Sequence, residues 1–290
     1  MTRMLELAVA HTDATTALHL SDLMFDLLSP RGIIVTAVED KADRWRVEAL
    51  LPPGERWADV CDELAQAYQP PLPAFSVDAI SEDAWQSAPQ PELEPIKAGR
   101  FIVHDTAHKP AALSGIAVEI DAGLAFGTGH HATTAGCLTA LDDILKSRKI
   151  SNPLDLGCGT AVLAIAVAKA LRLEVMASDI DPVAVRVAAE NAAKNGVASL
   201  VHTLTAVGFD HQQIAARAPY DLILANILAN PLMELARAMR QHMTAGGTAI
   251  LSGILAHQAQ RVAARYRAVG FVMERSRTIA EWSVLVLRAE

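Results

Sequence analysis

Apolar and polar positions in the first 80 residues follow two periods, one typical of strands and one of helices. Runs of β-branched residues or of strict alternation predict strands over residues 4–9, 33–36, 44–50 and 74–77. Apolar residues at helical spacing predict helices over residues 13–29 and 56–68. This β-α-β-β-α-β order is that of a ferredoxin-like split unit, so we predict a small α+β domain over residues 1–82.

The chain then passes through a segment without periodicity. Residues 86–95 are rich in proline and acidic side chains, so we predict a linker over residues 83–98. Two strand-like runs follow at 100–104 and 116–120, and from residue 153 strands and helices alternate to the C-terminus. Such alternation is typical of a doubly wound parallel sheet. We therefore predict an α/β fold with a Rossmann-like sheet over residues 99–290.

Composition narrows the classes of protein to which the chain can belong. Apolar residues make up 51% of the 290, which is enough for sizeable cores. No uncharged apolar stretch of about 18 residues occurs, and three cysteines form no CxxC pair, so we predict a cytoplasmic protein without a membrane span. Two domains of these sizes are compatible with a monomer. The formal charge of −8 argues against general binding of nucleic-acid backbones and favours a basic partner.

A pair of glycines ends the first predicted strand of the doubly wound half. Residues 154–161, LDLGCGTA, read as a buried strand, a tight turn and the start of an apolar helix. Glycines at such a turn let a ligand lie against bare backbone. A dinucleotide site carries a third glycine where this chain has Val162, so the pair favours a cofactor without a pyrophosphate. Gly157 and Gly159 are therefore predicted to bind a cofactor, and a plain tight turn is the alternative.

Polar residues also end the second and fourth predicted strands. Asp179 is placed to accept hydrogen bonds from ribose hydroxyls, whereas Asp181, directly before Pro182, is placed to cap a helix. Asn226 offers one acceptor and two donors to an amine substrate, with a simple turn as the alternative. Because the carboxyl ends of parallel strands meet at one edge of a sheet, we expect these residues to share a site.

A glycine-rich loop precedes these strands. Residues 121–134 read DAGLAFGTGHHATT, and Thr133-Thr134 open a predicted helix. The loop is suited to cover a bound cofactor, and Thr134 to hydrogen-bond it. The neighbouring His130 and His131 point apart in most conformations, and no Cys, Asp or Glu set completes their coordination, so we predict no metal site.

Together, the glycine pair, the Asp179 tip and the Asn226 tip resemble class I S-adenosylmethionine-dependent methyltransferases. The loop at 123–129 with Thr133-Thr134, the run 226–228 (NIL) and the run 251–255 (LSGIL) resemble the PrmA family, which methylates large-subunit ribosomal protein L11. This likeness covers the chain from about Gly99 onward. It implies S-adenosylmethionine as cofactor, contacted by Thr134, Gly157, Asp179 and Asn226, and a ferredoxin-like N-terminal domain that recognises the substrate.

The resemblance also implies a reaction, the transfer of methyl groups to a lysine side chain or an N-terminal amine of a basic ribosomal protein. Asn226, as the catalytic residue, and the carbonyls of 226–228 are expected to hold the amine, with no direct nucleic-acid readout. Phe126 and Leu228 are expected to exclude water, and His131 or water to take the proton. The loop departs from the family pattern DPGLAFGTGTHPTT at Ala122, His130 and Ala132.

Two other functions stay open at this point. One is a nucleic-acid or other protein N-methyltransferase, although nucleic-acid enzymes often carry Asn-Pro-Pro-aromatic where this chain has NILA at 226–229. The other is a protein that binds S-adenosylmethionine without catalysis. A nicotinamide oxidoreductase is disfavoured by Val162 and by the absence of an evident catalytic Tyr–Lys pair in the sequence.

Overall fold

The computed structural model describes residues 4–28, 31, 33–41, 44–69, 71–81, 95–106, 109, 114–120, 132–280 and 282–290. The chain divides into two compact units, Met1–Gln90 and Pro91–Glu290, hereafter the N-terminal and C-terminal units. No helix within the described ranges has both the length and the apolar character needed to cross a membrane.

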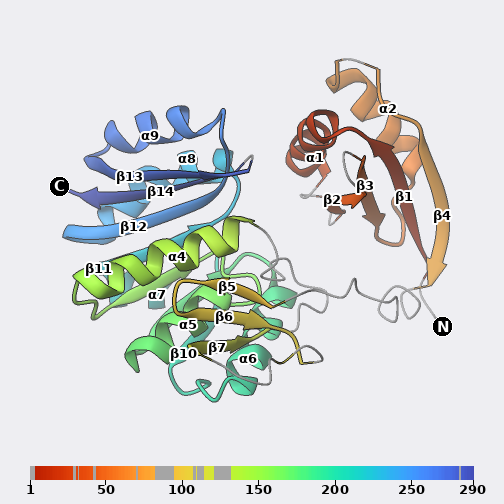
Figure 1. The fold of residues 1–290 in the computed structure, drawn as a ribbon. Coiled ribbons are helices and arrows are strands. Elements are labelled where there is room, and N and C mark those ends of the chain that lie inside the picture. The colour runs from red at the N-terminus through yellow and green to blue at the C-terminus, as the bar shows by residue number, and fades with distance from the viewer. Residues whose placement is uncertain are drawn as a thin grey trace. The chain divides into compact units, whose positions relative to one another are not determined.

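The N-terminal unit is an antiparallel sheet packed against two helices (Figure 1). Its elements are β1 (Met4–Thr12), α1 (Ala14–Leu28), β2 (Ile34–Lys41), β3 (Arg44–Leu51), α2 (Trp57–Ala67) and β4 (Phe75–Ser81). The strand order β2-β3-β1-β4, antiparallel throughout, is the ferredoxin-like arrangement that the sequence predicts. Ala8, Val47 and Ala49 alternate with less buried neighbours, which places one face of the sheet under the helices.

The C-terminal unit is built on a sheet of seven strands. They are β8 (Pro153–Leu156), β9 (Val175–Asp179), β10 (Val201–Thr205), β11 (Tyr220–Asn226), β12 (Met243–Leu255), β13 (Phe271–Ile279) and β14 (Trp282–Ala289). Their order is β10-β9-β8-β11-β12-β14-β13, with β14 alone antiparallel to its two neighbours. The chain thus builds outward in two directions from β8 and β11, which makes their shared end the switch point where such folds bind ligands.

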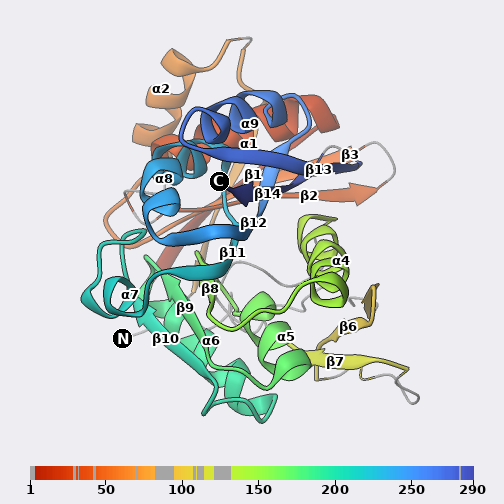
Figure 2. The same ribbon diagram turned by 90° about the vertical axis from the view of Figure 1, so that its left-hand side faces the viewer.

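Helices cover both faces of this sheet (Figure 2). One face packs against α4 (Ala132–Ser147), α5 (Val162–Leu171) and α6 (Pro182–Lys194), and the other against α7 (Gln212–Arg217), α8 (Ala229–Gln241) and α9 (Ala259–Arg267). Alternate residues of β11 pack into the cores on the two faces of the sheet. Leu222 and Leu224 belong to the core beneath α4–α6, and Ile223 and Ala225 to the core beneath α7–α9. The predicted doubly wound α/β fold is confirmed.

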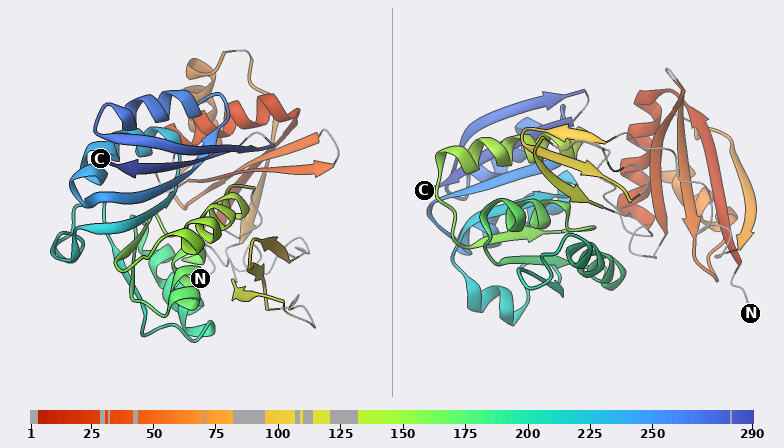
Figure 3. Two further views of the ribbon diagram at one scale, coloured as in Figure 1. Left: turned by 60° about the vertical axis from the view of Figure 1, so that its left-hand side comes forward. Right: turned by 60° about the horizontal axis from the view of Figure 1, so that its bottom comes forward.

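A separate sheet of three short strands lies beside α4 and α5 (Figure 3). It consists of β5 (Ile96–Ala98), β6 (Phe101–His104) and β7 (Ile116–Glu119). The Asn195 side chain holds β7 by accepting from the Glu119 N–H at 3.0 Å and donating to the Glu119 carbonyl at 2.6 Å. β5 falls within the residues predicted as linker and was not expected, and neither was α7.

Candidate cofactor and substrate site

The turn after β8 is bonded to the end of β9. The N–H groups of Gly157 and Cys158 donate to the Ser178 carbonyl at 2.8 and 2.9 Å. Gly157 and Gly159 have φ values of +68° and +52°, a region that glycine enters without steric cost. The local sequence therefore forms the tight turn that was predicted, with its backbone against the neighbouring strand.

Asp179 lies directly beside this turn. One carboxylate oxygen accepts from the Gly159 N–H at 2.8 Å and the other from the Asp181 N–H at 3.0 Å. These two bonds fix the carboxylate and leave lone pairs on both oxygens for a ligand. Asp181 itself accepts from the Val183 N–H at 2.8 Å, so its predicted role as the N-cap of α6, ahead of Pro182, is confirmed.

Asp155, which the sequence analysis did not select, is a further acidic group here. The residue is 1% exposed, and one carboxyl oxygen accepts from the Ala164 N–H in the first turn of α5 at 2.9 Å. The other oxygen has no hydrogen-bond partner among the described residues. Burial raises the pKa of this carboxyl to about 8, the charge of Asp179 adds to the shift, and the bond from Ala164 opposes it.

The loop after β11 passes between two glycines. A Cβ on Gly157 would lie 2.3 Å from Ile227 Cγ2, and one on Gly253 would lie 2.4 Å from the Ile227 carbonyl oxygen. Gly253 has a φ of +78°, in the middle of a register shift between β12 and β14. The Ile227 side chain therefore fills the space beside Gly157, and the Ile227 backbone occupies the place where a side chain on Gly253 would stand.

The start of α4 lies against the same strand ends. Asn226 Nδ2 donates to Thr134 Oγ1 at 3.5 Å, and Ser252 Oγ donates to the Thr133 carbonyl at 3.5 Å. Thr134 is 1% exposed. α4 approaches the sheet closely at Gly136, where a Cβ would lie 2.6 Å from Val284 Cγ2. This close packing brings the Thr134 hydroxyl within reach of Asn226.

Two apolar side chains remain exposed at this edge of the sheet. Ile180 follows β9, Val207 follows β10, and each is 65% exposed. The two strands are neighbours, with Asp179 opposite Thr205 and the Ala206 N–H donating to the Asp179 carbonyl at 2.9 Å. The strand ends thus present apolar surface next to the Asp179 carboxylate, which suits a flat apolar ring attached to a polar sugar.

The structure brings the predicted site residues to one edge of the sheet. Gly159 contacts Asp179, Asn226 contacts Thr134, and Gly157 lies against Ile227. Phe126, His130, His131 and the rest of the loop at 121–131 lie outside the described residues. Asp155, Gly253, Ile180 and Val207 were missed; the first two stand in motifs already noted, but their roles depend on tertiary contacts. No metal-binding cluster of His, Cys, Asp or Glu is present in the described parts of the chain.

Comparison with known families gives one match over nearly the whole chain. Residues 9–290 match the family model described as ribosomal protein L11 methyltransferase (PrmA). A ribosomal protein L11 methyltransferase of Bradyrhizobium diazoefficiens is 52% identical over 215 residues, which cover 74% of this chain and 73% of the relative. One from Brucella suis is 43% identical over 254 residues, or 87% of this chain and 82% of the relative.

Comparison with solved structures agrees with these sequence matches. The crystal structure of a ribosomal protein L11 methylase from Lactobacillus delbrueckii subsp. bulgaricus superposes with a TM-score of 0.61 at 26% sequence identity. The match covers 68% of this chain and 99% of that one.

Proposed function

The chain belongs to the ribosomal protein L11 methyltransferase (PrmA) family, and we propose that it transfers methyl groups from S-adenosylmethionine to amines of ribosomal protein L11. The observation that carries the assignment of the site is the meeting of Gly157, Gly159, Asp179, Asn226 and Thr134 at the switch point of the sheet. In a doubly wound fold, this edge is where a ligand binds.

The described residues fit S-adenosylmethionine rather than a dinucleotide. The Asp179 carboxylate favours a ligand with sulfonium and ammonium charges, and such charges would lower the raised pKa of the buried Asp155 carboxyl, whereas a pyrophosphate would raise it further. The Asp155 oxygen that has no partner among the described residues is buried, which suits a bond to a small enclosed group such as a water molecule. Asp179 would hold the ribose, Ile180 and Val207 the adenine, and the turn at Gly157–Gly159 the amino-acid end, with Thr134 contacting the cofactor.

The protein's part in the reaction is mainly to position the amine. When bound, the cofactor supplies an electrophilic methyl group. Asn226 uses its Nδ2 toward Thr134, which leaves Oδ1 to accept an N–H from the incoming amine. Ile227, held between Gly157 and Gly253, fixes the backbone carbonyls beside it. A lysine amine has an ordinary pKa of about 10.4 and must lose its proton before it attacks, which low hydration of the site assists.

We assign recognition of L11 to the N-terminal unit, which has its own core, separate from the strand ends that carry the proposed cofactor site. The net charge of −8 favours approach of a basic protein. We further propose that the enzyme acts in the cytoplasm as a monomer. Its three cysteines are free, which suits a reducing compartment.

A matched pair of aspartate variants tests the cofactor site. Asp179→Ala removes the proposed ribose acceptor, and we expect S-adenosylmethionine affinity to fall about 10- to 100-fold by calorimetry. Asp181→Ala, two residues away, removes only the cap of α6, so it should lower stability by about 1 kcal/mol and leave affinity within about threefold. Equal losses of affinity in the two variants would refute the ribose assignment.

Transfer of a radiolabelled methyl group tests the reaction itself. Purified L11, total RNA and DNA are offered separately, and we expect label on L11 alone. Asn226→Ala should lower kcat by about 100-fold, because the amine loses its acceptor, and should change cofactor affinity much less. Unchanged kcat in this variant would remove Asn226 from the mechanism, and label on nucleic acid alone would overturn the substrate.

A further inference from the structure

Arginines gather on α8 and α9, two of the three helices that cover the second face of the large sheet. α8 carries Arg237 and Arg240, and α9 carries Arg261, Arg265 and Arg267. Glu234 is the one acidic residue in these two helices. The helices pack against each other through a core that includes Leu232 and Tyr266, so their outward faces form one surface.

Two of these arginines are held by neutral groups: Arg265 Nε donates to the Met233 carbonyl at 3.0 Å, and Arg261 donates to Asn230 Oδ1 at 2.5 Å. Arg240 donates to the Met243 carbonyl and to the main-chain oxygen of the last residue, Glu290. Within the described part of the chain, none of the five forms an ion pair with an acidic side chain. Their charge is therefore available to a partner, and the backbone bonds orient two of the guanidinium groups in advance.

The surface is basic although the chain as a whole is acidic. α8 and α9 together contain five arginines and one glutamate, with no lysine or aspartate, a formal charge of +4. The rest of the chain carries −12. The net charge of −8 argues against nucleic-acid binding by the chain in general, but one region of the chain has a positive charge.

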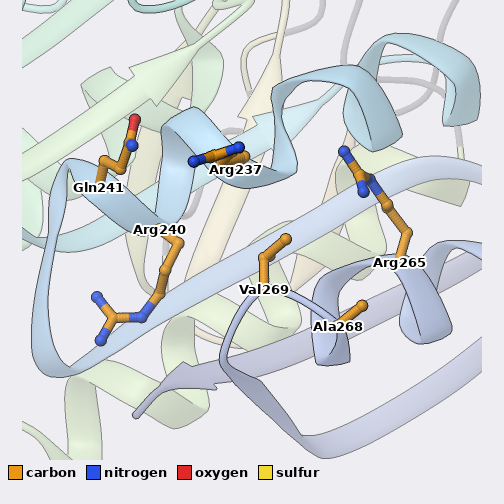
Figure 4. Close-up of a pocket in the computed structure, with 6 residues that line it drawn as sticks. All are labelled: Arg237, Arg240, Gln241, Arg265, Ala268 and Val269. Carbon is orange, nitrogen blue, oxygen red and sulfur yellow. The ribbon is translucent and has the colours of Figure 1, made fainter.

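A groove runs between the two helices at this place (Figure 4). Arg237, Arg240 and Gln241 line it from α8, and Arg265, Ala268 and Val269 from the end of α9, around a cavity volume of about 440 Å³. Three guanidinium groups are thus distributed along the groove, above a floor of small aliphatic side chains. Among the residues that the structure describes, no aromatic side chain lines it.

We propose that this groove binds the phosphate backbone of RNA, without reading its sequence. Arginine presents paired N–H donors that match two phosphate oxygens, and here every cationic side chain in the groove is an arginine. Successive cations along a groove suit a chain of phosphates better than one small anion. Because no aromatic ring lines the groove in the described part of the chain, aromatic stacking on bases does not supply the affinity, and the phosphates are the recognised feature.

Paired charge reversals test the proposal. Arg237→Glu with Arg265→Glu removes two groove cations, and Lys149→Glu with Arg186→Glu makes the same charge change at exposed positions in the loop after α4 and on α6. Binding of fluorescein-labelled single-stranded RNA is followed by anisotropy between about 50 and 200 mM salt. We expect the groove variant to lose affinity about tenfold or more and its salt slope to shrink by about 1–2 units, with little change in the control.

Further measurements test whether a loss of RNA binding arises from the groove arginines themselves. The groove variant should retain its methylation of free L11, because none of its changed residues belongs to the methyl-transfer site. Its melting temperature should fall only modestly, through loss of the hydrogen bond from Arg265 to the Met233 carbonyl. Inorganic pyrophosphate should compete weakly, and a polyglutamate peptide should not bind. Equal loss of RNA binding in the two variants, no RNA binding by the unaltered protein, or polyglutamate binding that depends on the same arginines would each overturn the proposal.

Discussion

At the scale of single residues, Asp155 accepts a hydrogen bond at the start of α5, but its burial makes the ionised carboxylate unfavourable. It caps the first turn of α5, whose own N-cap residue is Ala161 and offers no side-chain oxygen. It does so from a position that is 1% exposed, where the ionised form is poorly solvated. The unligated protein therefore holds a carboxyl group that favours its protonated state near neutral pH.

This conflict gives stability a definite dependence on pH. The carboxyl titrates at about 8 when folded against an ordinary 3.8, so between these values the folded state holds a proton that the unfolded state has lost. Its contribution is complete below pH 4 and is lost as pH rises to 8. At about 1.4 kcal/mol per pKa unit, the free energy of unfolding should fall on the order of 2–4 kcal/mol more between pH 5 and 8 than in Asp155→Asn.

Urea unfolding at the two pH values measures this difference. Asp210→Asn, at an exposed carboxyl of the same unit, is the matched control and should follow the unaltered protein. If Asp155→Asn shows the same loss between pH 5 and 8 as the unaltered protein, the group that titrates lies elsewhere.

The sequence identifies those site residues whose role depends on their place at a strand end. Asp179, Asn226 and the cap Asp181 all follow a predicted strand, and one edge of the sheet collects them. Asp155 and Gly253 could not be assigned in this way. Their roles arise from what packs against them, the start of α5 in one case and the backbone of Ile227 in the other.

At the scale of elements, the site depends on a close approach between β12 and the end of β11. Gly253 interrupts β12 with a φ of +78° and lets the Ile227 backbone come where a side chain would otherwise stand. Gly246, in the same strand, also has a φ of +78°, but a Cβ there would meet nothing within 4 Å. A substitution at Gly246 therefore costs only the free energy of an unfavourable backbone conformation. A substitution at Gly253 costs that free energy and also causes a steric clash.

Alanine substitutions at Gly246 and Gly253 should therefore have different effects on stability and activity. Gly246→Ala should cost about 1 kcal/mol of stability through the left-handed backbone alone and leave activity nearly unchanged. Gly253→Ala adds a collision with the Ile227 carbonyl, so the loop 226–228 must move, and we expect kcat to fall at least tenfold as well. Melting curves and methyl transfer measure both effects. Equal kcat in the two variants would mean that the loop position does not matter for catalysis.

Most elements follow from periodicity, and those that do not are short. α7 spans six residues with Ile214 as its one buried side chain, so no repeat marks it. β5 has three residues, and its pairing with β6 supplies the backbone hydrogen bonds that its own sequence does not predict. β12 extends from Met243 to Leu255, on both sides of the apolar run 249–251, since its pairing with β11 and β14 continues past that run.

At the scale of the whole molecule, the two units have separate cores. The N-terminal core draws on β1–β4 and both of their helices, and neither of the two larger cores includes a residue before Ile96. A unit of about 200 residues buries enough surface to fold alone. The division of labour proposed here, recognition in one unit and chemistry in the other, can therefore be tested by separating them.

The fragment Pro91–Glu290 is the direct test of this division. Because the whole edge bearing Gly157, Asp179 and Asn226 lies within it, we expect S-adenosylmethionine affinity within about threefold of the full chain by calorimetry. The kcat/KM for L11 should fall at least 100-fold, since about 3 kcal/mol of substrate binding is lost with a recognition surface. A fragment that binds the cofactor and methylates L11 as well as the full chain would place recognition in the C-terminal unit. Loss of cofactor binding in a folded fragment would instead show that the N-terminal unit completes the site.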